Sequence, residues 1–178
     1  MRLLLHQCCA PCSIYPLHRL LSEYGVDGVR GFFYNPNIHP YTEYRKRLNT
    51  LIEYNNYLKI EYVIENTYGL REFIRMEAKT ADRCGSCYLM RLEKTAEYAV
   101  KEGFEAFSTT LLYSRRQKHD QIRYICEKTA QKYGVGFWYE DYRIGWQTGI
   151  DMSKQLDMYR QLYCGCIFSE EERYNVEA

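Results

Sequence analysis

Charge of one sign, long apolar runs and internal repeats are all missing from this chain of 178 residues. Its 24 lysines and arginines nearly balance its 23 aspartates and glutamates, so the overall charge does not mark a nucleic-acid-binding protein. A local basic patch is compatible with this balance. No apolar run approaches the length of a membrane span. A chain of this length without a low-complexity linker is expected to form one domain with a core of its own.

A glycine loop for binding phosphate is also missing. The apolar run at residues 3–5 leads directly into cysteines and a proline. A phosphate cradle needs glycines there, because backbone N–H groups must approach the anion closely. We therefore expect no nucleotide hydrolysis at this loop.

We expect no signal peptide at the N-terminus, since the apolar stretch is short and turns polar at His6. The prediction is a cytoplasmic protein with no membrane partner. Disulfide frameworks are rare in the cytoplasm, so grouped cysteines in such a protein indicate metal binding or redox chemistry.

Cysteine is abundant, and seven of the eight cysteines fall into three tight groups. We call them the first, second and third thiol groups: Cys8-Cys9-Ala10-Pro11-Cys12, Cys84-Gly85-Ser86-Cys87 and Cys164-Gly165-Cys166. A structural zinc or a cubane iron–sulfur cluster takes four ligands, so three thiols would be left over. The eighth cysteine, Cys126, lies in a helical pattern and is expected to be a small core residue.

Short apolar runs alternate with helical patterns along the first 145 residues. Strands are predicted at residues 3–5, 29–34, 60–64, 104–109 and 137–139. Helices are predicted at residues 13–24, 42–58, 70–78, 87–102 and 119–133. Strands separated by such helices form βαβ units. We therefore predict an α/β fold, with a mostly parallel five-stranded sheet flanked by helices.

The predicted organisation is a single domain over residues 1–178. Residues 1–145 form the α/β core, and residues 146–178 form a helical or irregular extension that carries the third thiol group into the active site. The working site of such a sheet lies at the carboxyl ends of its strands. The first thiol group, the loop 35–40, the segment 109–120 and residues 141–143 each follow a strand, so we expect them at one edge.

The thiol groups allow more than one metal arrangement. Cys84 and Cys87 fit a metal-binding pair at a helix start, where the positive end of the helix favours thiolates. Cys8 and Cys9 reach the same metal only if the backbone turns between them, because neighbours in a strand point to opposite faces. The third group, with Cys12, could instead hold a second metal or cycle between dithiol and disulfide. A lone structural zinc leaves three thiols idle, so an iron–sulfur cluster is favoured.

The segment 108–120 is polar and basic. Arg115, Arg116 and Lys118 are candidates for contacts with RNA phosphates, while His119 or Asp120 could handle a proton or a metal. The alternative interpretation is a solvated loop in which Asp120 stands near a helix start. The same two interpretations apply to Asp141 and Arg143. For His39, in the proline-flanked loop, a structural role and a functional role are equally favoured.

Several motifs together resemble the cobalamin-independent epoxyqueuosine reductases, the QueH family, over nearly the whole chain. One departure is Arg115-Arg116 after Ser114, where the family pattern has Pro-Tyr; it concerns substrate contacts more than the metal site. The motifs that carry the resemblance are His6-Gln7-Cys8-Cys9-Ala10-Pro11-Cys12, Tyr34-Asn35-Pro36-Asn37-Ile38-His39-Pro40, Arg83-Cys84-Gly85-Ser86-Cys87-Tyr88, Ser108-Thr109-Thr110-Leu111-Leu112, Gln117-Lys118-His119-Asp120 and Tyr163-Cys164-Gly165-Cys166-Ile167-Phe168-Ser169.

The resemblance implies a two-electron reduction of the epoxide of epoxyqueuosine in tRNA, which gives queuosine in the last step of its synthesis. It implies a fold similar to the adenine-nucleotide alpha hydrolase-like (HUP-like) group, and neither cobalamin nor ATP as cofactor. The partners would be tRNA carrying epoxyqueuosine at the wobble position and an electron donor that the sequence does not identify.

The resemblance also implies roles for individual residues. Cys8, Cys9, Cys84 and Cys87 would be the [4Fe–4S] ligands, and Cys164 with Cys166 a redox-active pair. A second metal, expected to be iron, would lie beside the cluster, with Cys12 and either Asp120 or Asp141 as its ligands. Catalytic candidates are therefore Cys164, Cys166, His119, Asp120 and Asp141; substrate and tRNA candidates are Asn35, His39, Arg115, Arg116, Lys118 and Arg143.

Two other functions fit the residues. A tRNA sulfur-transfer enzyme of the same fold group would need ATP, which the glycine-poor loop after residues 3–5 argues against. A non-catalytic, zinc-stabilised RNA-binding module would be colourless and would show no redox response.

Overall fold

The computed structural model describes residues 1–175, and its centre is a sheet of five parallel strands in the order β3-β2-β1-β4-β5. All four neighbouring pairs are parallel, and His6 at the end of β1 is in register with Phe32 and Thr109. The strands are β1 (Leu3–His6), β2 (Val29–Phe33), β3 (Tyr62–Ile64), β4 (Ala106–Thr109) and β5 (Gly136–Phe137).

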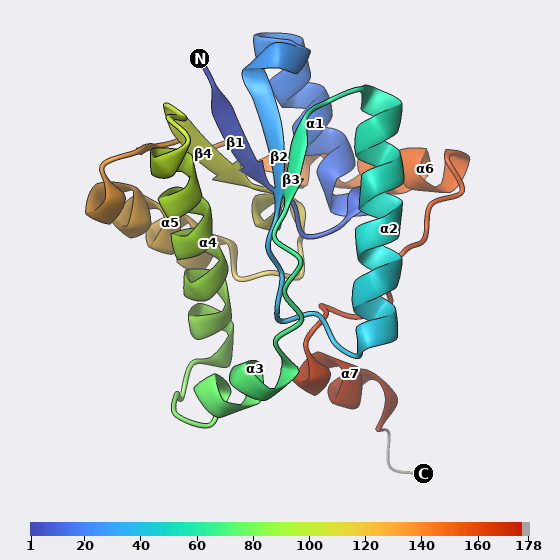
Figure 1. The fold of residues 1–178 in the computed structure, drawn as a ribbon. Helices are drawn as coiled ribbons and strands as arrows, with labels where there is room; N and C mark the ends of the chain where they lie inside the picture. Colours follow the sequence, from blue (N-terminus) through green and yellow to red (C-terminus); the bar gives the residue numbers. More distant parts are fainter. Residues whose placement is uncertain (176–178) are drawn as a thin grey trace.

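Helices cover both faces of the sheet (Figure 1). They are α1 (Ala10–Tyr24), α2 (Tyr41–Leu58), α3 (Leu70–Glu77), α4 (Arg83–Lys101), α5 (His119–Tyr133), α6 (Trp146–Gln155) and α7 (Ile167–Tyr174), with short 3-10 turns η1 (Val26–Gly28), η2 (Thr110–Tyr113) and η3 (Tyr142–Gly145). This architecture confirms the predicted five-stranded parallel α/β sheet. Among residues 1–175, no helix combines the length and the apolar composition needed to cross a bilayer.

Alternation along the strands divides the core into two layers, because successive side chains of a strand point to opposite faces. Leu3, Leu5 and Phe33 pack with apolar side chains of α1 and α2. Leu4, Phe32 and Phe107 pack with α4 and α5. Cys126 on α5 is fully buried in the second layer, as predicted.

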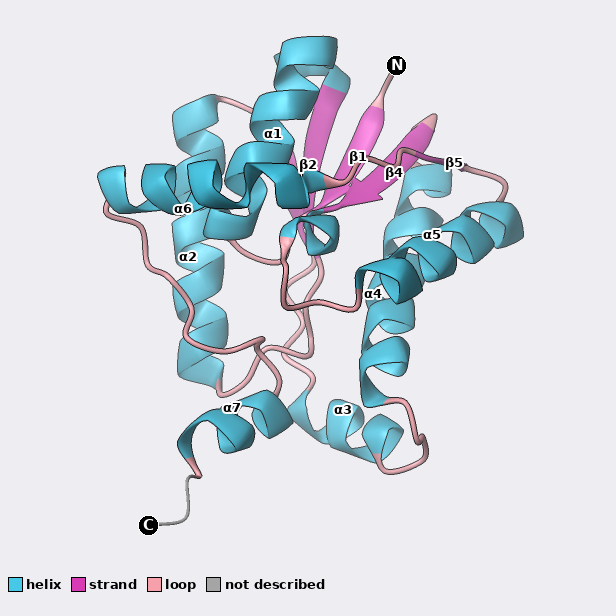
Figure 2. Cartoon of the chain, turned by 180° about the vertical axis from the view of Figure 1, so that it is seen from behind, coloured by secondary structure: helices cyan, strands magenta, loops and turns pink. Residues whose placement is uncertain are grey.

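Beyond the carboxyl ends of the strands, α3 and α7 lie next to each other in both views (Figures 1 and 2). The rings of Phe73 on α3 and Phe168 on α7 are 6.3 Å apart, which ties the two helices together. Helix α6 packs against α1. Of the predicted extension 146–178, residues 176–178 lie outside the described part of the chain.

Candidate active site

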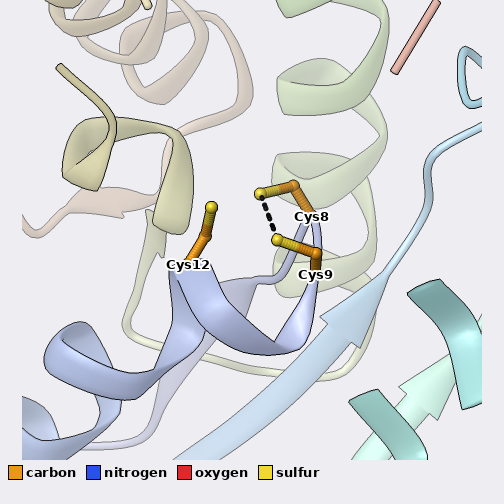
Figure 3. A group of neighbouring side chains, drawn as sticks. All are labelled: Cys8, Cys9 and Cys12. Atoms are coloured by element: carbon orange, nitrogen blue, oxygen red, sulfur yellow. Dashed lines mark hydrogen bonds between the residues drawn. The ribbon is translucent and has the colours of Figure 1, made fainter. Parts of the chain in front are cut away.

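The first thiol group lies in the turn from β1 into α1. Helix α1 begins at Ala10, with Pro11 in its first turn, where a missing N–H costs nothing. The Sγ atoms of Cys8, Cys9 and Cys12 all lie within 4.8 Å of one another, and Figure 3 shows them converging on one point. The backbone turn that Cys8 and Cys9 need to face one site is present, because their sulfurs are 3.8 Å apart.

The three thiols of this group differ in acidity. Hydrogen bonds from Cys12 and Cys9 hold the pKa of Cys8 well below its usual value. The Thr110 hydroxyl, 3.3 Å away, adds a further bond to the Cys8 sulfur. Burial raises the pKa of Cys9, and the bond that Cys12 donates to Cys8 raises the pKa of Cys12. Cys8 is therefore the most acidic of three adjacent sulfurs, and such a set of sulfur donors suits a soft metal.

The second thiol group opens α4. Asp82 caps this helix by accepting a hydrogen bond from the Gly85 N–H at 3.1 Å. A side chain at Gly85 would collide with the Asp82 carboxylate, so glycine is needed between the two cysteines. Helix α4 begins at Arg83, about one turn before the predicted start at Cys87, so Cys84 lies in its first turn and Cys87 at the start of the second. Burial raises the pKa of Cys87 to about 12 and also raises that of Cys84.

The third thiol group lies in the loop that precedes α7. Gly165 has φ +140°, a backbone conformation that glycine adopts and other residues rarely do. A Cβ there would also approach Arg47 Nη1 to 2.9 Å. The two cysteines point to different partners: the Cys164 sulfur accepts from Gln117 Nε2 at 3.2 Å, while the Cys166 sulfur caps α7 by accepting the Ser169 N–H at 3.4 Å.

A buried ion pair on α2 holds this loop. Arg47 donates to the carbonyl oxygens of Cys164 at 2.8 Å and Tyr163 at 3.0 Å. Its Nε donates to Glu43 Oε1 at 2.6 Å, and the Tyr159 hydroxyl donates to the other oxygen of Glu43. The side chains of Arg47 and Glu43 are only 2% and 7% exposed, so the pair is shielded from solvent and firmly fixes the loop.

His39 makes the second attachment of the loop. Its backbone N–H donates to the Gly165 carbonyl at 2.7 Å, and its Nδ1 accepts the Ile167 N–H at 3.3 Å. Its Nε2 donates to the Pro36 carbonyl at 3.0 Å. Burial lowers the pKa of His39 to about 4, so the ring is neutral and joins the β2–α2 loop to α7.

A cavity of about 200 Å³ adjoins the first and third thiol groups. Four arginines line it, and none of the described residues that line it is a carboxylate. One wall is aromatic, because the rings of Tyr113 and Trp146 are 5.2 Å apart. We call this space the thiol cavity; its lining includes Cys8, Cys12, Cys164, Arg47, Arg91, Arg116, Arg160, Gln117, Gln161, Tyr113, Trp146 and Leu162. It suits a small anionic or polar group bound beside sulfur.

Comparison with known proteins identifies the family of this chain. Residues 3–172 match the family described as "Epoxyqueuosine reductase QueH". The protein of that name from Dehalococcoides mccartyi is 39% identical over 97% of this chain and 94% of its own length. The one from Thermotoga maritima is 39% identical over 96% of this chain and 91% of its own length. The protein of that name from Haemophilus influenzae is 37% identical over 94% of this chain and 71% of its own length. This chain belongs to the QueH family.

Family membership confirms the resemblance, and with it the assignment to a family of oxidoreductases. The fold is similar to that of the U34-tRNA thiolase NcsA from Methanococcus maripaludis, solved with its [4Fe–4S] cluster. The TM-score is 0.62 at 13% identity, covering 98% of this chain but 63% of the thiolase's length. The likeness confirms the predicted fold group.

Among residues 1–175, Cys8, Cys9 and Cys12 form the one set of three or more metal-ligating side chains within 4.8 Å of one another. The QueH resemblance implied Cys84 and Cys87 as partners of Cys8 and Cys9. Cys12, for which the resemblance implies a second metal, lies beside the first two cysteines. The second group stays close enough to the third for the charges of Cys164 and Cys166 to oppose ionisation of Cys87, although burial dominates its pKa.

Two of the substrate candidates, Asn35 and His39, form hydrogen bonds within the protein that hold loops in place. Asn35 is buried and donates to the Gln7 carbonyl at 2.9 Å, and His39 holds the third thiol group. Lys118 lies 3.5 Å from Asp82 and lowers the pKa of Cys84 against the larger effect of burial. Arg116 lines the thiol cavity, whereas Arg115 lies at a separate surface beside Arg143 and Ile144.

The candidate acids and bases do not line the thiol cavity. Asp141 caps η3 and pairs with Arg143 at 2.8 and 2.6 Å; this hydrogen bonding lowers the pKa of Asp141 to about 2. His119 contacts the Tyr139 hydroxyl at 3.2 Å. Asp120 lies in the first turn of α5. Of the two interpretations of Asp141, capping describes its position, because this carboxylate accepts the Arg143 N–H at the start of η3.

Sequence reasoning missed several polar groups that contact the thiols. Arg91 lies four residues after Cys87 on α4, and Arg47 lies four residues after Glu43 on α2. Gln161 Nε2 donates to the sulfurs of Cys9 and Cys12 at 3.0 and 3.4 Å. The i, i+4 spacing of the two arginines was a signal, because such residues share one face of a helix. Nothing in the pattern around Gln161 indicates its contact.

Proposed function

We propose that this chain reduces the epoxide of epoxyqueuosine in tRNA to the cyclopentene of queuosine. The observation that carries the proposal is the convergence of thiols at one cavity in a member of the QueH family. The reaction consumes two electrons and two protons: both carbon–oxygen bonds of the epoxide break, a carbon–carbon double bond forms, and the oxygen leaves as water.

The proposed cofactor is a [4Fe–4S] cluster held by Cys8 and Cys9 together with Cys84 and Cys87. Support comes from the 3.8 Å separation of the first two sulfurs, from the two helix N-termini that favour thiolates, and from the cluster in the thiolase of similar fold. Such a cluster supplies electrons one at a time. Cys12 lies within 4.8 Å of Cys8 and Cys9 and is an alternative ligand for the same group.

A second iron and a redox-active pair, Cys164 with Cys166, complete the proposal. Cys164 lines the thiol cavity and receives a hydrogen bond from Gln117, so it could ligate that iron or store the second electron. The only support for Asp120 as a ligand of that iron is its position in the first turn of α5. We divide the chain into a core (residues 1–145) and an extension (146–178). The extension contributes Arg160, Gln161 and Cys164 to the thiol cavity.

The thiol cavity is the proposed site of the epoxide. Its volume, about 200 Å³, lies below the usual 300–1,000 Å³ of sites for drug-sized ligands, which suits the modified ring of one nucleotide. An unpaired base is commonly read by stacking on aromatic rings, for which Tyr113 and Trp146 are available. Arg116 and Arg160 at the cavity suit the tRNA phosphates, and no cobalamin or ATP takes part.

The experiment is anaerobic reconstitution with iron and sulfide, followed by incubation with tRNA that contains epoxyqueuosine and a chemical reductant. The expected result is a brown protein that converts epoxyqueuosine to queuosine without added ATP or cobalamin, detected by mass analysis of the digested nucleosides. Unchanged epoxyqueuosine with a fully loaded protein would contradict the proposal.

The second candidate, ATP-dependent sulfur transfer to tRNA, is favoured only by the thiolase of similar fold. It predicts binding of ATP by the isolated protein, which the cysteine-rich loop after β1 opposes. A calorimetric titration with ATP separates the two functions. A zinc-stabilised RNA-binding module would instead give a colourless protein that does not change on reduction.

A further inference from the structure

Arg91 is a buried cation directly beside the thiols. It lies on α4, one turn after Cys87, and is 3% exposed. Its Nε donates to the Cys87 carbonyl at 3.1 Å, and its Nη2 lies 3.3 Å from the Cys87 sulfur. The guanidinium also lines the thiol cavity together with Cys8 and Cys164, so it faces all three thiol groups.

Arg91 differs from the other buried arginine in its counter-charge. Arg47 is paired with Glu43 at 2.6 Å. Among residues 1–175, Arg91 forms no ion pair with a carboxylate.

A buried charge without a partner is strongly destabilising. The groups available to balance Arg91 are sulfurs. A bound metal group takes its cysteine ligands as thiolates. Its binding therefore places negative charge next to the Arg91 guanidinium, which lies 3.3 Å from the Cys87 sulfur.

We propose that Arg91 is the counter-ion of the sulfur site, a positioning residue that raises the reduction potential of the iron–sulfur cluster bound there. The inference rests on the proposed function for the presence of the cluster. Reduction adds one negative charge to the site, and a nearby buried cation stabilises the more negative state. Net charge and hydrogen bonds to sulfur are established determinants of cluster potential.

The test is a redox titration of the reconstituted protein, followed by electron paramagnetic resonance, on the wild type, Arg91→Met and Arg91→Lys. Arg123→Met, which removes an exposed arginine on α5, is the matched control. At the wild-type midpoint, Arg91→Met should show a reduced-to-oxidised ratio at least about tenfold lower, which corresponds to about 59 mV for one electron. Arg91→Lys and Arg123→Met should stay near the wild-type ratio.

The iron-free proteins supply a second readout, urea unfolding. Arg91→Met should be as stable as the wild type or more stable, because replacing a buried charge by an apolar side chain of similar volume is often neutral or stabilising. The same variant should gain less stability than the wild type when iron and sulfide are added. A purely structural role predicts the reverse: lower stability without iron and an unchanged cluster potential.

The outcomes separate this inference from the proposed function. A wild type that takes up no cluster ends the proposed function, whatever Arg91 does. A loaded Arg91→Met with the wild-type potential overturns the inference alone, and so does an equal loss of potential in Arg91→Lys, which would assign the effect to the hydrogen bond. If Arg91→Met takes up no iron, loading of Arg91→Lys supports the inference, and failure of both variants overturns it.

Discussion

At the residue scale, the chemistry depends on which sulfur carries charge and which stays protonated. Hydrogen bonds from Cys12, Cys9 and Thr110 lower the pKa of Cys8, which makes it the most acidic thiol of the first group. The neighbouring thiols keep their protons until a metal displaces them, since burial and the shared hydrogen bonds oppose their ionisation. Metal uptake must therefore release protons and must weaken as the pH falls.

Replacement of Cys8 tests this assignment. We expect Cys8→Ala to lose most of its iron after anaerobic reconstitution, because the variant removes the most acidic thiol, around which the other sulfurs are arranged. Cys126→Ala is the matched control: this cysteine is fully buried on α5 but belongs to no thiol group. Iron and sulfide analysis measures both. Equal iron content in the two variants would contradict the assignment.

The third thiol group allows a sharper comparison. As a redox-active pair, Cys164 and Cys166 should both be needed, so Cys164→Ser and Cys166→Ser should each keep the cluster's absorbance and lose turnover by at least about tenfold, about 1.4 kcal/mol of barrier. Serine at position 166 can still cap α7, so loss of the helix does not confound the result. Full turnover in Cys166→Ser would show that Cys164 acts alone.

At the scale of elements, two helices present thiols in their first turns and a third helix holds the loop that faces them. The parallel sheet, its helices and the edge where the site lies were predictable, because apolar periodicity and strand-to-helix alternation dictate them. Element ends were less predictable. Helix α4 begins at Arg83 because Asp82 caps it, whereas the sequence interpretation placed its start at Cys87.

The attachment of the C-terminal loop could not be predicted from sequence. Glu43 and Arg47 are charged residues within the predicted helix 42–58, yet both are buried. Their partners, Tyr159 and the Cys164 carbonyl, lie more than 110 positions away. Periodicity tells which face of a helix is apolar; it carries no information on which distant loop covers the remaining polar groups.

Removal of Arg47 measures what this attachment contributes. Arg47→Ala should lower the free energy of unfolding by about 3–5 kcal/mol, because it leaves Glu43 buried without its partner. Arg19→Ala, which breaks the exposed pair with Glu140, should cost at most about 1 kcal/mol. Urea unfolding of the two iron-free variants gives both values. Similar losses in the two would mean that the buried pair contributes no more than a surface pair.

At the scale of the whole molecule, stability should depend on pH through two buried histidines, His6 and His39. Burial depresses the pKa of each to about 4 in the folded chain, against about 6.5 in the unfolded chain. The unfolded state therefore binds more protons between these values, so stability is full above about pH 6.5 and is lost as the pH falls toward 4. Each histidine contributes up to about 1.4 kcal/mol per pH unit within this window.

His39→Gln should remove about half of this slope, because an amide can replace both side-chain hydrogen bonds without titrating while His6 still titrates. His18→Gln, at an exposed position on α1, serves as control and should leave the slope unchanged. The measurement is urea unfolding of the iron-free proteins from pH 7.5 to pH 5. A wild-type slope retained in His39→Gln would assign the acid sensitivity to other groups.

The central claim is that sulfurs from distant parts of the chain converge to hold an iron–sulfur cluster. Diffraction from anaerobically reconstituted crystals, collected at the iron absorption edge, tests it most directly. The account predicts an anomalous peak of several iron atoms within bonding distance of the Cys8 and Cys9 sulfurs. A single zinc there, or no iron signal in a crystal of fully reconstituted protein, would contradict it.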